Sequence, residues 1–143
     1  MRALLDVNVL IALLDSAHVG HPVAMRWMAS QVTRGWASCP LTQNGCIRVM
    51  SQPAYGGNFV APQVATQLNA ATSDSAHAFW PADLSLLEAG VLDWSQVLGH
   101  RQVTDNYLLA LAVRHQGRLA SFDSGIALNA VRGARSSHLV LLS

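Results

Sequence analysis

Short apolar runs recur along this chain, and stretches with helical spacing or helix-start residues separate them. Strands are expected around Leu4 and Leu5 and over residues 36–39, 77–80, 119–122 and 139–142. Helices are expected over residues 8–14, 21 to about 35, 41–50, 61–71, 81–94 and 104–115. Short buried strands that alternate with helices are typical of an α/β sandwich, in which helices flank a central, mostly parallel sheet. The 143 residues suit a single domain spanning residues 1–143.

Two of the expected helices carry further predictions. The second helix opens at Pro22, which suits a first turn. Its buried stripe is expected to contain Val23, Met25, Trp27 and Met28. The helix over residues 104–115 is apolar on nearly all sides, which predicts burial on both faces.

Three of the eight acidic residues stand at the ends of these apolar segments. Asp6 and Asp123 follow expected strands, and Asp105 opens the last long helix. In α/β folds ligands bind beyond the carboxyl ends of the strands, where such carboxylates can meet. Gathered carboxylates repel one another until a hard divalent cation such as Mg²⁺ or Mn²⁺ joins them. A bound ion of this kind activates water and stabilises charge on a phosphate, so the pattern favours hydrolysis of a phosphodiester.

Each of these acids also has an ordinary structural explanation. Asp6 can simply end a strand, Asp105 can be a helix-start acid favoured by the helix dipole, and Asp123 can be a turn residue. For any one of these residues taken alone, the structural explanation is a good alternative to a metal site. The three together favour the metal site.

The absence of lysine excludes several other uses of strand-end aspartates. All nine basic residues are Arg, whereas P-loop proteins and kinases need a Lys on the phosphates. Haloacid-dehalogenase phosphatases and response-regulator receivers also rely on Lys. The net charge of +1 predicts no broad basic face, so contacts with a polyanion must come from local Arg clusters. Only 12% of the residues are charged, which suggests that a partner covers some apolar face.

The remaining composition points to the cytoplasm. Cys39 and Cys46 do not form a CxxC pair and are expected to be free thiols in a reducing compartment. Asp6 and Asp15 interrupt the N-terminal apolar stretch too early for a signal peptide. No run approaches the roughly 18 apolar residues of a membrane span. His18 and His21 lack a third ligand for a zinc site.

At the acidic residues the sequence resembles a known family. The segments 4–11 (LLDVNVLI), 104–108 (TDNYL) and 121–123 (SFD) resemble the three acidic motifs of PIN-domain ribonucleases. The segments 40–49 (PLTQNGCIRV) and 79–81 (FWP) further resemble the VapC toxin branch, in particular its mycobacterial type. Each motif is weak alone, but the ordered set runs over the whole chain.

The resemblance implies a PIN-like three-layer sandwich and a Mg²⁺- or Mn²⁺-dependent endoribonuclease. Asp6, Asp105 and Asp123 would be its metal ligands and catalytic residues. It also implies the toxin of a type II toxin–antitoxin system, a homodimer held by a cognate VapB-type antitoxin. Asn8 and Thr104 match polar positions that orient the acidic cluster, and Thr104 also suits a helix cap.

Gln43 departs from the family pattern, because PIN domains usually have Glu at this position. The amide oxygen of Gln43 can hydrogen-bond a metal-bound water but brings no charge. With about three carboxylates instead of four, the site is expected to bind metal more weakly or to hold one ion well. Alternatively, Gln43 is a plain residue on a helix surface.

Three further residues are candidates for substrate contact. Arg48 lies about one helical turn beyond Gln43 and suits a substrate phosphate, an active-site acid or a structural salt bridge. His100 and Arg101 precede Thr104 in a loop that contains glycine, where they can meet RNA. His100 suits a proton shuttle, although it can equally be an incidental loop residue.

Three hypotheses for function follow. The first is an RNase toxin in which metal-activated water cleaves a structured RNA with a single-stranded loop. The second, which Gln43 favours, is a catalytically weak PIN-like module that binds RNA or a partner. The third is a metal-dependent DNA nuclease, since no residue singled out here reads a 2′-hydroxyl.

Overall fold

A parallel sheet forms the centre of the computed structural model, which describes all of residues 1–143. Its five strands are β1 (Ala3–Leu5), β2 (Trp36–Ser38), β3 (His77–Phe79), β4 (Arg118–Ser121) and β5 (Leu139–Leu141). They lie in the order β3-β2-β1-β4-β5, and every neighbouring pair is parallel. All five strands therefore end at the same edge of the sheet.

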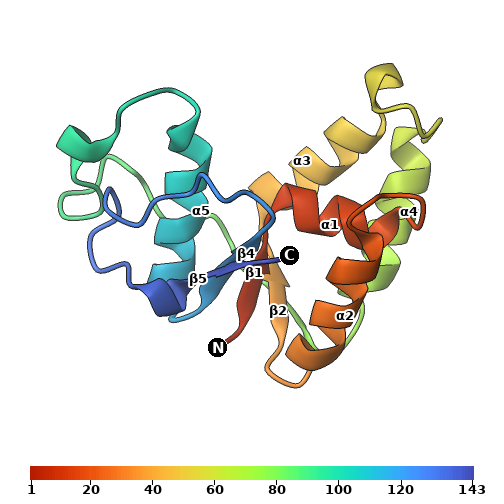
Figure 1. Ribbon diagram of the computed structural model, residues 1–143, viewed down its shortest axis with the longest axis horizontal. Helices are drawn as coiled ribbons and strands as arrows, with labels where there is room; N and C mark the ends of the chain where they lie inside the picture. Colours follow the sequence, from red (N-terminus) through yellow and green to blue (C-terminus); the bar gives the residue numbers. More distant parts are fainter.

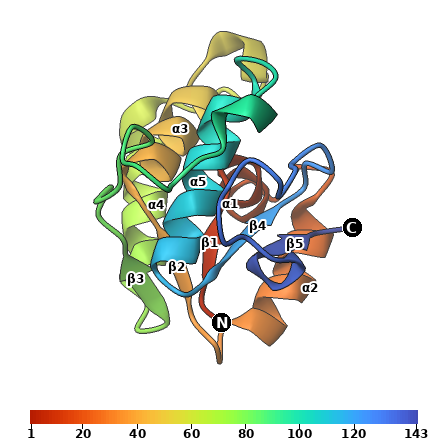
Figure 2. The same cartoon turned by 90° about the vertical axis from the view of Figure 1, so that its left-hand side faces the viewer.

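Helices cover both faces of this sheet. They are α1 (Val7–Leu14), α2 (His21–Gln31), α3 (Pro40–Met50), α4 (Ala61–Thr72) and α5 (Gln102–Arg114). Figure 1 shows α1 to α4 on one side of the strands and α5 on the other. Figure 2 looks onto the α5 side, with the strands behind the helix. The predicted α/β sandwich is confirmed, and its sheet is entirely parallel.

The core has two halves because successive residues of a strand point to opposite faces of the sheet. In β1, Ala3 and Leu5 pack with α1 in one buried cluster, whereas Leu4 packs with α5 in the other. Residues 108–112 of α5 are all buried, which confirms the prediction for this helix. Strands covered on both faces need apolar residues at nearly every position, as these have.

A glycine allows α3 to approach α1 at the edge where the strands end. A Cβ atom on Gly45 would lie 2.6 Å from Cγ2 of Val7, which opens α1. Gly45 is also buried inside α3, where glycine is otherwise unfavourable. Close packing of the two helices therefore explains a residue that the sequence pattern alone would count against the helix.

The helix predicted from Pro81 to about Trp94 is wrong. This segment pairs instead with the chain near residue 131, through an isolated antiparallel bridge between Leu92 and Val131. Gly90 has a φ of +86°, a left-handed conformation that interrupts any helix. Tertiary pairing thus overrides the local preference, and only a 3₁₀ turn at Trp94–Gln96 remains.

The predicted buried stripe of α2 is partly wrong. Met25 is 49% exposed, and the fully buried residues of this helix are Ala24 and Gln31. The helix also ends at Gln31, before Gly35. Val23, Trp27 and Met28 do pack against the core, as expected.

Two smaller observations concern the cysteines and the helices as a group. Cys39 and Cys46 are both free thiols, as predicted, and both are buried. None of the helices combines the length and the apolar character that crossing a membrane requires.

Candidate active site

The acidic residues gather where β1 and β4 end side by side. Leu5 pairs with Ala120 in the register of these strands, and the backbone N–H of Asp6 donates to the Ala120 carbonyl over 2.9 Å. Asp6 therefore leaves β1 next to the end of β4, which Asp123 follows by two residues. Asp105 lies in the first turn of α5, on the opposite face of the sheet from α1 (Figure 1). The charges of Asp6 and Asp123 both act on Asp105, so the three acids lie near enough for their charges to interact.

Asp6 is a buried carboxylate held by two hydrogen bonds. It caps the start of α1, where Oδ1 accepts from the backbone N–H of Val7 over 2.7 Å. Its Oδ2 accepts from the hydroxyl of Ser121 over 2.6 Å. Burial raises the pKa of Asp6, the two hydrogen bonds oppose that shift, and the charge of Asp123 adds to it. The carboxylate is therefore fixed in direction but electrostatically strained.

Ser121 connects three site residues through a single hydroxyl. Besides donating to Asp6, its Oγ accepts from Nδ2 of Asn8 over 3.1 Å and from the backbone N–H of Asp123 over 3.0 Å. Oδ1 of Asn8 in turn accepts from the backbone N–H of Phe122 over 3.2 Å. Asn8 thus reaches the acids through the end of β4. Sequence reasoning missed this role of Ser121, although a small hydroxyl residue two positions before a strand-end Asp is the available signal.

Asp105 is the least satisfied of the three acids. It is partly buried, and no group in the structure donates a hydrogen bond to its carboxylate. Burial, followed by the charges of Asp6 and Asp123, raises its pKa to about 6. Asp123 is exposed by comparison, and its Oδ1 accepts from the backbone N–H of Gly125 over 2.8 Å.

The donor chemistry of this cluster fits a hard divalent cation. No three His, Cys, Asp or Glu side chains are close enough in this structure to enclose a metal ion. Asp6, Asp105 and Asp123 nevertheless offer oxygen atoms alone, which Mg²⁺ and Mn²⁺ prefer. Burial, and then the charges of Asp6 and Asp123, raise the pKa of Asp105, and its carboxylate has no hydrogen-bond donor, so a cation at this edge would stabilise the ionised form.

Gln43 is engaged at the next strand end along the sheet. Its Nε2 donates to Oγ of Ser38 over 3.0 Å, and that oxygen lies 2.8 Å from Nε2 of His77. The pKa of His77 is lowered, chiefly by burial, so its neutral ring can accept the Ser38 proton. Ser38 ends β2, which lies beside β1, about 4.8 Å away across the sheet. Gln43 is thus partly buried and oriented, and it is not hydrogen-bonded to the acids.

Thr104 does not cap α5 as predicted. The helix begins at Gln102, two residues earlier than expected, and Thr104 is exposed within its first turn. Gln102 holds the preceding loop instead, because its Oε1 accepts from the backbone N–H groups of Leu98 and Gly99 over 2.6 and 3.1 Å.

The three candidate substrate-binding residues are all exposed. His100 and Arg101 lie in the loop directly before α5, and Arg48 lies in the last turn of α3. Arg48 forms no salt bridge, because the two ion pairs of the structure join Arg114 to Glu88 and His115 to Asp83. All three side chains are therefore free to meet a ligand.

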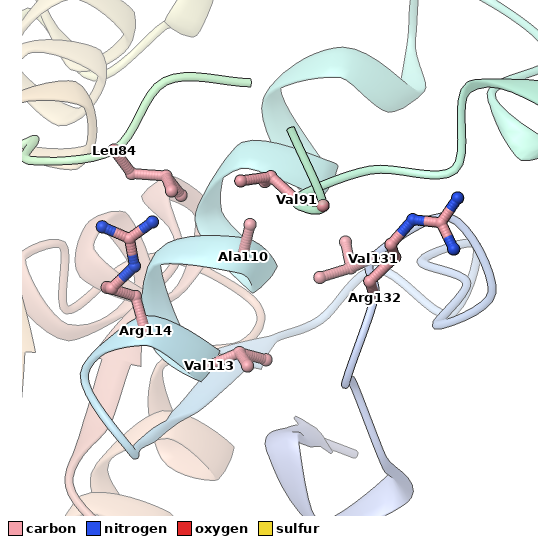
Figure 3. Close-up of a pocket in the computed structure, with 8 residues that line it drawn as sticks. Leu84, Val91, Ala110, Val113, Arg114, Val131 and Arg132 are labelled. Atoms are coloured by element: carbon pink, nitrogen blue, oxygen red, sulfur yellow. The ribbon is translucent and has the colours of Figure 1, made fainter. Parts of the chain in front are cut away.

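A separate cleft on the α5 side contains none of the acids. It has a volume of about 130 Å³, and its apolar lining includes Val91, Ala110 and Val131. Arg114 and Arg132 flank it from opposite sides (Figure 3). Since Arg114 is already paired with Glu88, Arg132 is the one side chain of this cleft whose charge is not in an ion pair.

Several curated proteins resemble this chain over nearly its full length. Ribonuclease VapC44 of Mycobacterium tuberculosis strain H37Rv is 51% identical over 142 residues, which are 99% of this chain and 100% of that protein. Ribonuclease VapC39 of the same strain is 44% identical over 134 residues, 93% of this chain and 96% of its own. Ribonuclease VapC29 is 43% identical over 127 residues, 89% of this chain and 90% of its own. No family model matches the chain.

A solved structure shares the fold. The crystal structure of VapC20 from Mycobacterium tuberculosis, described as a sarcin–ricin loop cleaving toxin, superposes with a TM-score of 0.62. The match covers 86% of this chain and 91% of that one at 13% sequence identity. At this identity the likeness establishes the arrangement of helices and strands.

We predict that Asp105→Asn makes the metal-free protein more stable at neutral pH. The pKa of Asp105 is raised from 3.8 to about 6, so folding favours its protonated form. Its stabilising contribution is complete below about pH 4 and is lost as the pH rises through about 6. Thermal unfolding in EDTA should show an advantage of Asp105→Asn over the wild type that grows across this window.

Asp93→Asn is the matched control, because the Ser95 hydrogen bond lowers the pKa of Asp93. Asp93→Asn should have the opposite effect: relative to the wild type, the variant should be less stable at neutral pH than at acid pH. If Asp105→Asn were more stable than the wild type by the same amount at every pH, the raised pKa of Asp105 would be contradicted.

Proposed function

The chain belongs to the VapC ribonuclease family, and from this premise we propose that it is the toxin of a type II toxin–antitoxin system. We further propose that it acts in the cytoplasm and that residues 1–143 form a single PIN domain. We place RNA cleavage at the edge where Asp6, Asp105 and Asp123 meet. The observation that supports this assignment is the pairing of β1 with β4, which sets Asp6 beside the end of the strand that Asp123 follows. Burial, and then the charges of Asp6 and Asp123, raise the pKa of Asp105 at the same edge. Phosphodiester hydrolysis is the chemistry that such a cluster serves when a divalent cation is bound.

The residues of the chain have separable roles in this proposal. Asp6, Asp105 and Asp123 would hold Mg²⁺ or Mn²⁺, which supplies charge stabilisation and an activated water. Ser121 fixes the direction of Asp6 through its 2.6 Å hydrogen bond and thereby positions the cluster. The pKa of Asp105 is raised to about 6, so its carboxylate exchanges a proton near physiological pH more readily than an ordinary Asp.

RNA would be held by local positive charge around this edge. His100 and Arg101 stand in the loop before the helix that carries Asp105, and Arg48 is exposed on α3. Arg side chains bind phosphate through two donors at once. A structured RNA with a single-stranded loop is the expected substrate, since unpaired bases are what proteins read in RNA.

A cognate VapB-type antitoxin and a second copy of the chain are the proposed partners. The low charge content supports a covered face. So does an apolar groove between α1, α2 and α4, whose lining includes Leu14, Met28 and Leu68.

A catalytically weak binding module is the alternative, and Gln43 favours it. The acidic cluster has three carboxylates where the family pattern has a fourth at the position of Gln43. Because one N–H of the Gln43 amide donates to Ser38, its carbonyl oxygen is the acceptor left to assist a metal-bound water.

We predict that the purified protein cuts a structured RNA when Mn²⁺ is added and that Asp6→Asn abolishes the cut. Asn caps a helix about as well as Asp, so the variant should fold and lose only a metal ligand. Cleavage is followed on denaturing gels, with Asp74→Asn, an exposed acid after α4, as the control that stays active. Undiminished cleavage by Asp6→Asn would indicate a contaminating nuclease. A DNA strand of the same sequence cut at the same rate would favour the DNA nuclease.

Gln43→Glu should bind Mn²⁺ about tenfold more tightly than the wild type and be less stable without metal. A fourth carboxylate strengthens an oxygen site, but Glu cannot donate to Ser38 and adds repulsion. Titration calorimetry measures the affinity, and thermal unfolding in EDTA measures the stability.

The matched control for this change is Asn44→Asp, which adds one negative charge at the exposed neighbouring position of α3. Equal affinities of the two variants would place Gln43 outside the metal site. Binding of RNA without any Mn²⁺ binding at millimolar concentration would instead favour the binding module.

In cells, expression of the chain alone should arrest growth, and co-expression of the cognate antitoxin should restore it. Asp6→Asn, expressed to the same level, should leave growth unaffected because the cluster loses a charge. Growth curves with matched protein levels measure this. Normal growth at every level of soluble wild-type protein would count against a toxin.

A further inference from the structure

An open cavity lies at the end of α1 that is remote from the acids. It has a volume of about 440 Å³ and is bounded by the loop after α1 and the segment after α3. Its walls include Asp15, His18, Tyr55, Gly57 and Phe59. Both bounding segments lie on the same side of the sheet as α1 and α4 (Figure 1).

One wall of this cavity is aromatic and firmly held. The ring centroids of Tyr55 and Phe59 are 6.0 Å apart, and the rings are tilted by 60°. Gly57 packs against both rings, because a Cβ atom there would collide with Phe59 and lie 3.1 Å from Tyr55. Both side chains also pack against the buried core. The cavity therefore presents a pre-formed stacking surface.

A carboxylate of fixed orientation also lines the cavity. Asp15 is 9% exposed, its Oδ2 accepts from the hydroxyl of Tyr55, and its Oδ1 accepts from the backbone N–H of Ala17 over 3.0 Å. No Arg or His forms an ion pair with it. Each oxygen keeps a further lone pair, so Asp15 offers acceptors alone to a ligand. This argues against a phosphate as the occupant, since no Arg lines the cavity and the carboxylate repels anions.

The cavity is joined to the acidic edge in two ways. Helix α1 carries Asp6 at its start and Asp15 at its end, a separation of about 13 Å for nine residues. His18 and Phe122 both contact Gly20, where a Cβ would lie 3.2 and 3.0 Å from them, and Phe122 directly precedes Asp123. A strand of about four stacked nucleotides spans such a distance.

We propose that this cavity is a subsite for one unstacked guanine of the RNA substrate, an inference that rests on the proposed RNA cleavage. The base packs against the two tilted rings of Tyr55 and Phe59, stacked on one and edge-on to the other, and the Asp15 carboxylate accepts from its N1–H and N2–H groups. Guanine is the base whose Watson–Crick edge carries two adjacent donors, which match two carboxylate oxygens. Uracil offers a single N–H between two carbonyls, and adenine and cytosine place a lone pair beside their amino group. Stacking and edge recognition of this kind are how proteins read single-stranded RNA.

The test is an NMR titration of the metal-free protein in EDTA with the 5′-monophosphates of guanosine, adenosine, cytidine and uridine. The phosphate is common to all four probes, so differences among them report the base. GMP should shift the amide signals of Gly56 and Gly57 and bind about fivefold or more tightly than UMP. Shifts that miss both glycines, or equal binding of all four nucleotides, would overturn the guanine site.

Two variants separate stacking from edge recognition. Phe59→Leu keeps an apolar side chain but removes a ring, so it should weaken the binding of all four nucleotides. Asp15→Asn replaces one acceptor by a donor, so it should remove most of the preference for GMP over UMP. Phe79→Leu, an exposed aromatic residue on β3, is the control that leaves binding unchanged. Full GMP preference in Asp15→Asn, or full binding in Phe59→Leu, would refute the assignment.

Cleavage assays with Mn²⁺ on the same preparations keep the two proposals apart. RNA cleavage without GMP binding would refute the guanine subsite alone. GMP binding at Gly56 and Gly57 without RNA cleavage would refute the proposed nuclease and leave a guanine-binding site.

Discussion

The parallel pairing of β1 with β4 is the constraint on which the candidate site depends. It sets the end of β1 beside Ala120, so that Asp6 and Ser121 meet although 115 positions separate them in sequence. The Ser121 hydroxyl then ties Asp6, Asn8 and the Asp123 backbone into one unit. Because the apolar side chains of β1 pack on both faces of the sheet, a shift of register would misplace the acids and the core together. The same residues therefore specify the fold and the site.

Most of the fold could be predicted because its signals are local. Five short apolar runs became the five strands, and the apolar helix over residues 104–115 became the buried α5 with a slightly earlier start. The error at residues 81–94 has a non-local origin, since the bridge from Leu92 to Val131 has no counterpart in local propensity. The prediction that Met25 is buried was wrong for a simpler reason, because Ala24 and Gln31 mark a different face of α2 as the buried one.

In the candidate site, too, the features with local sequence signals could be predicted and the non-local ones could not. The positions of Asp6, Asp105 and Asp123 at segment ends were visible in the sequence, and the family resemblance pointed to Asn8, whereas the role of Ser121 was not foreseen. Ser121 acts through three hydrogen bonds to distant or non-adjacent groups, and Gln43 reaches His77 only through Ser38 on another strand. Such networks depend on which strands are neighbours, and a single sequence does not contain that order. The residue types indicated the chemistry of the acids, whereas the order of the strands determined which residues hydrogen-bond to them.

Charge balance links the stability of this protein to its proposed chemistry. Burial and mutual repulsion raise the pKa values of Asp6 and Asp105, so the metal-free fold carries a strain that a cation relieves. A glutamate at position 43 would increase that strain, whereas Gln43 is neutral and its amide is satisfied by Ser38. The neutral residue therefore favours a metal-free protein that stays folded and binds its cation less tightly. On this reasoning, the departure from the family pattern shifts the balance toward stability while the three acids that define the site remain in place.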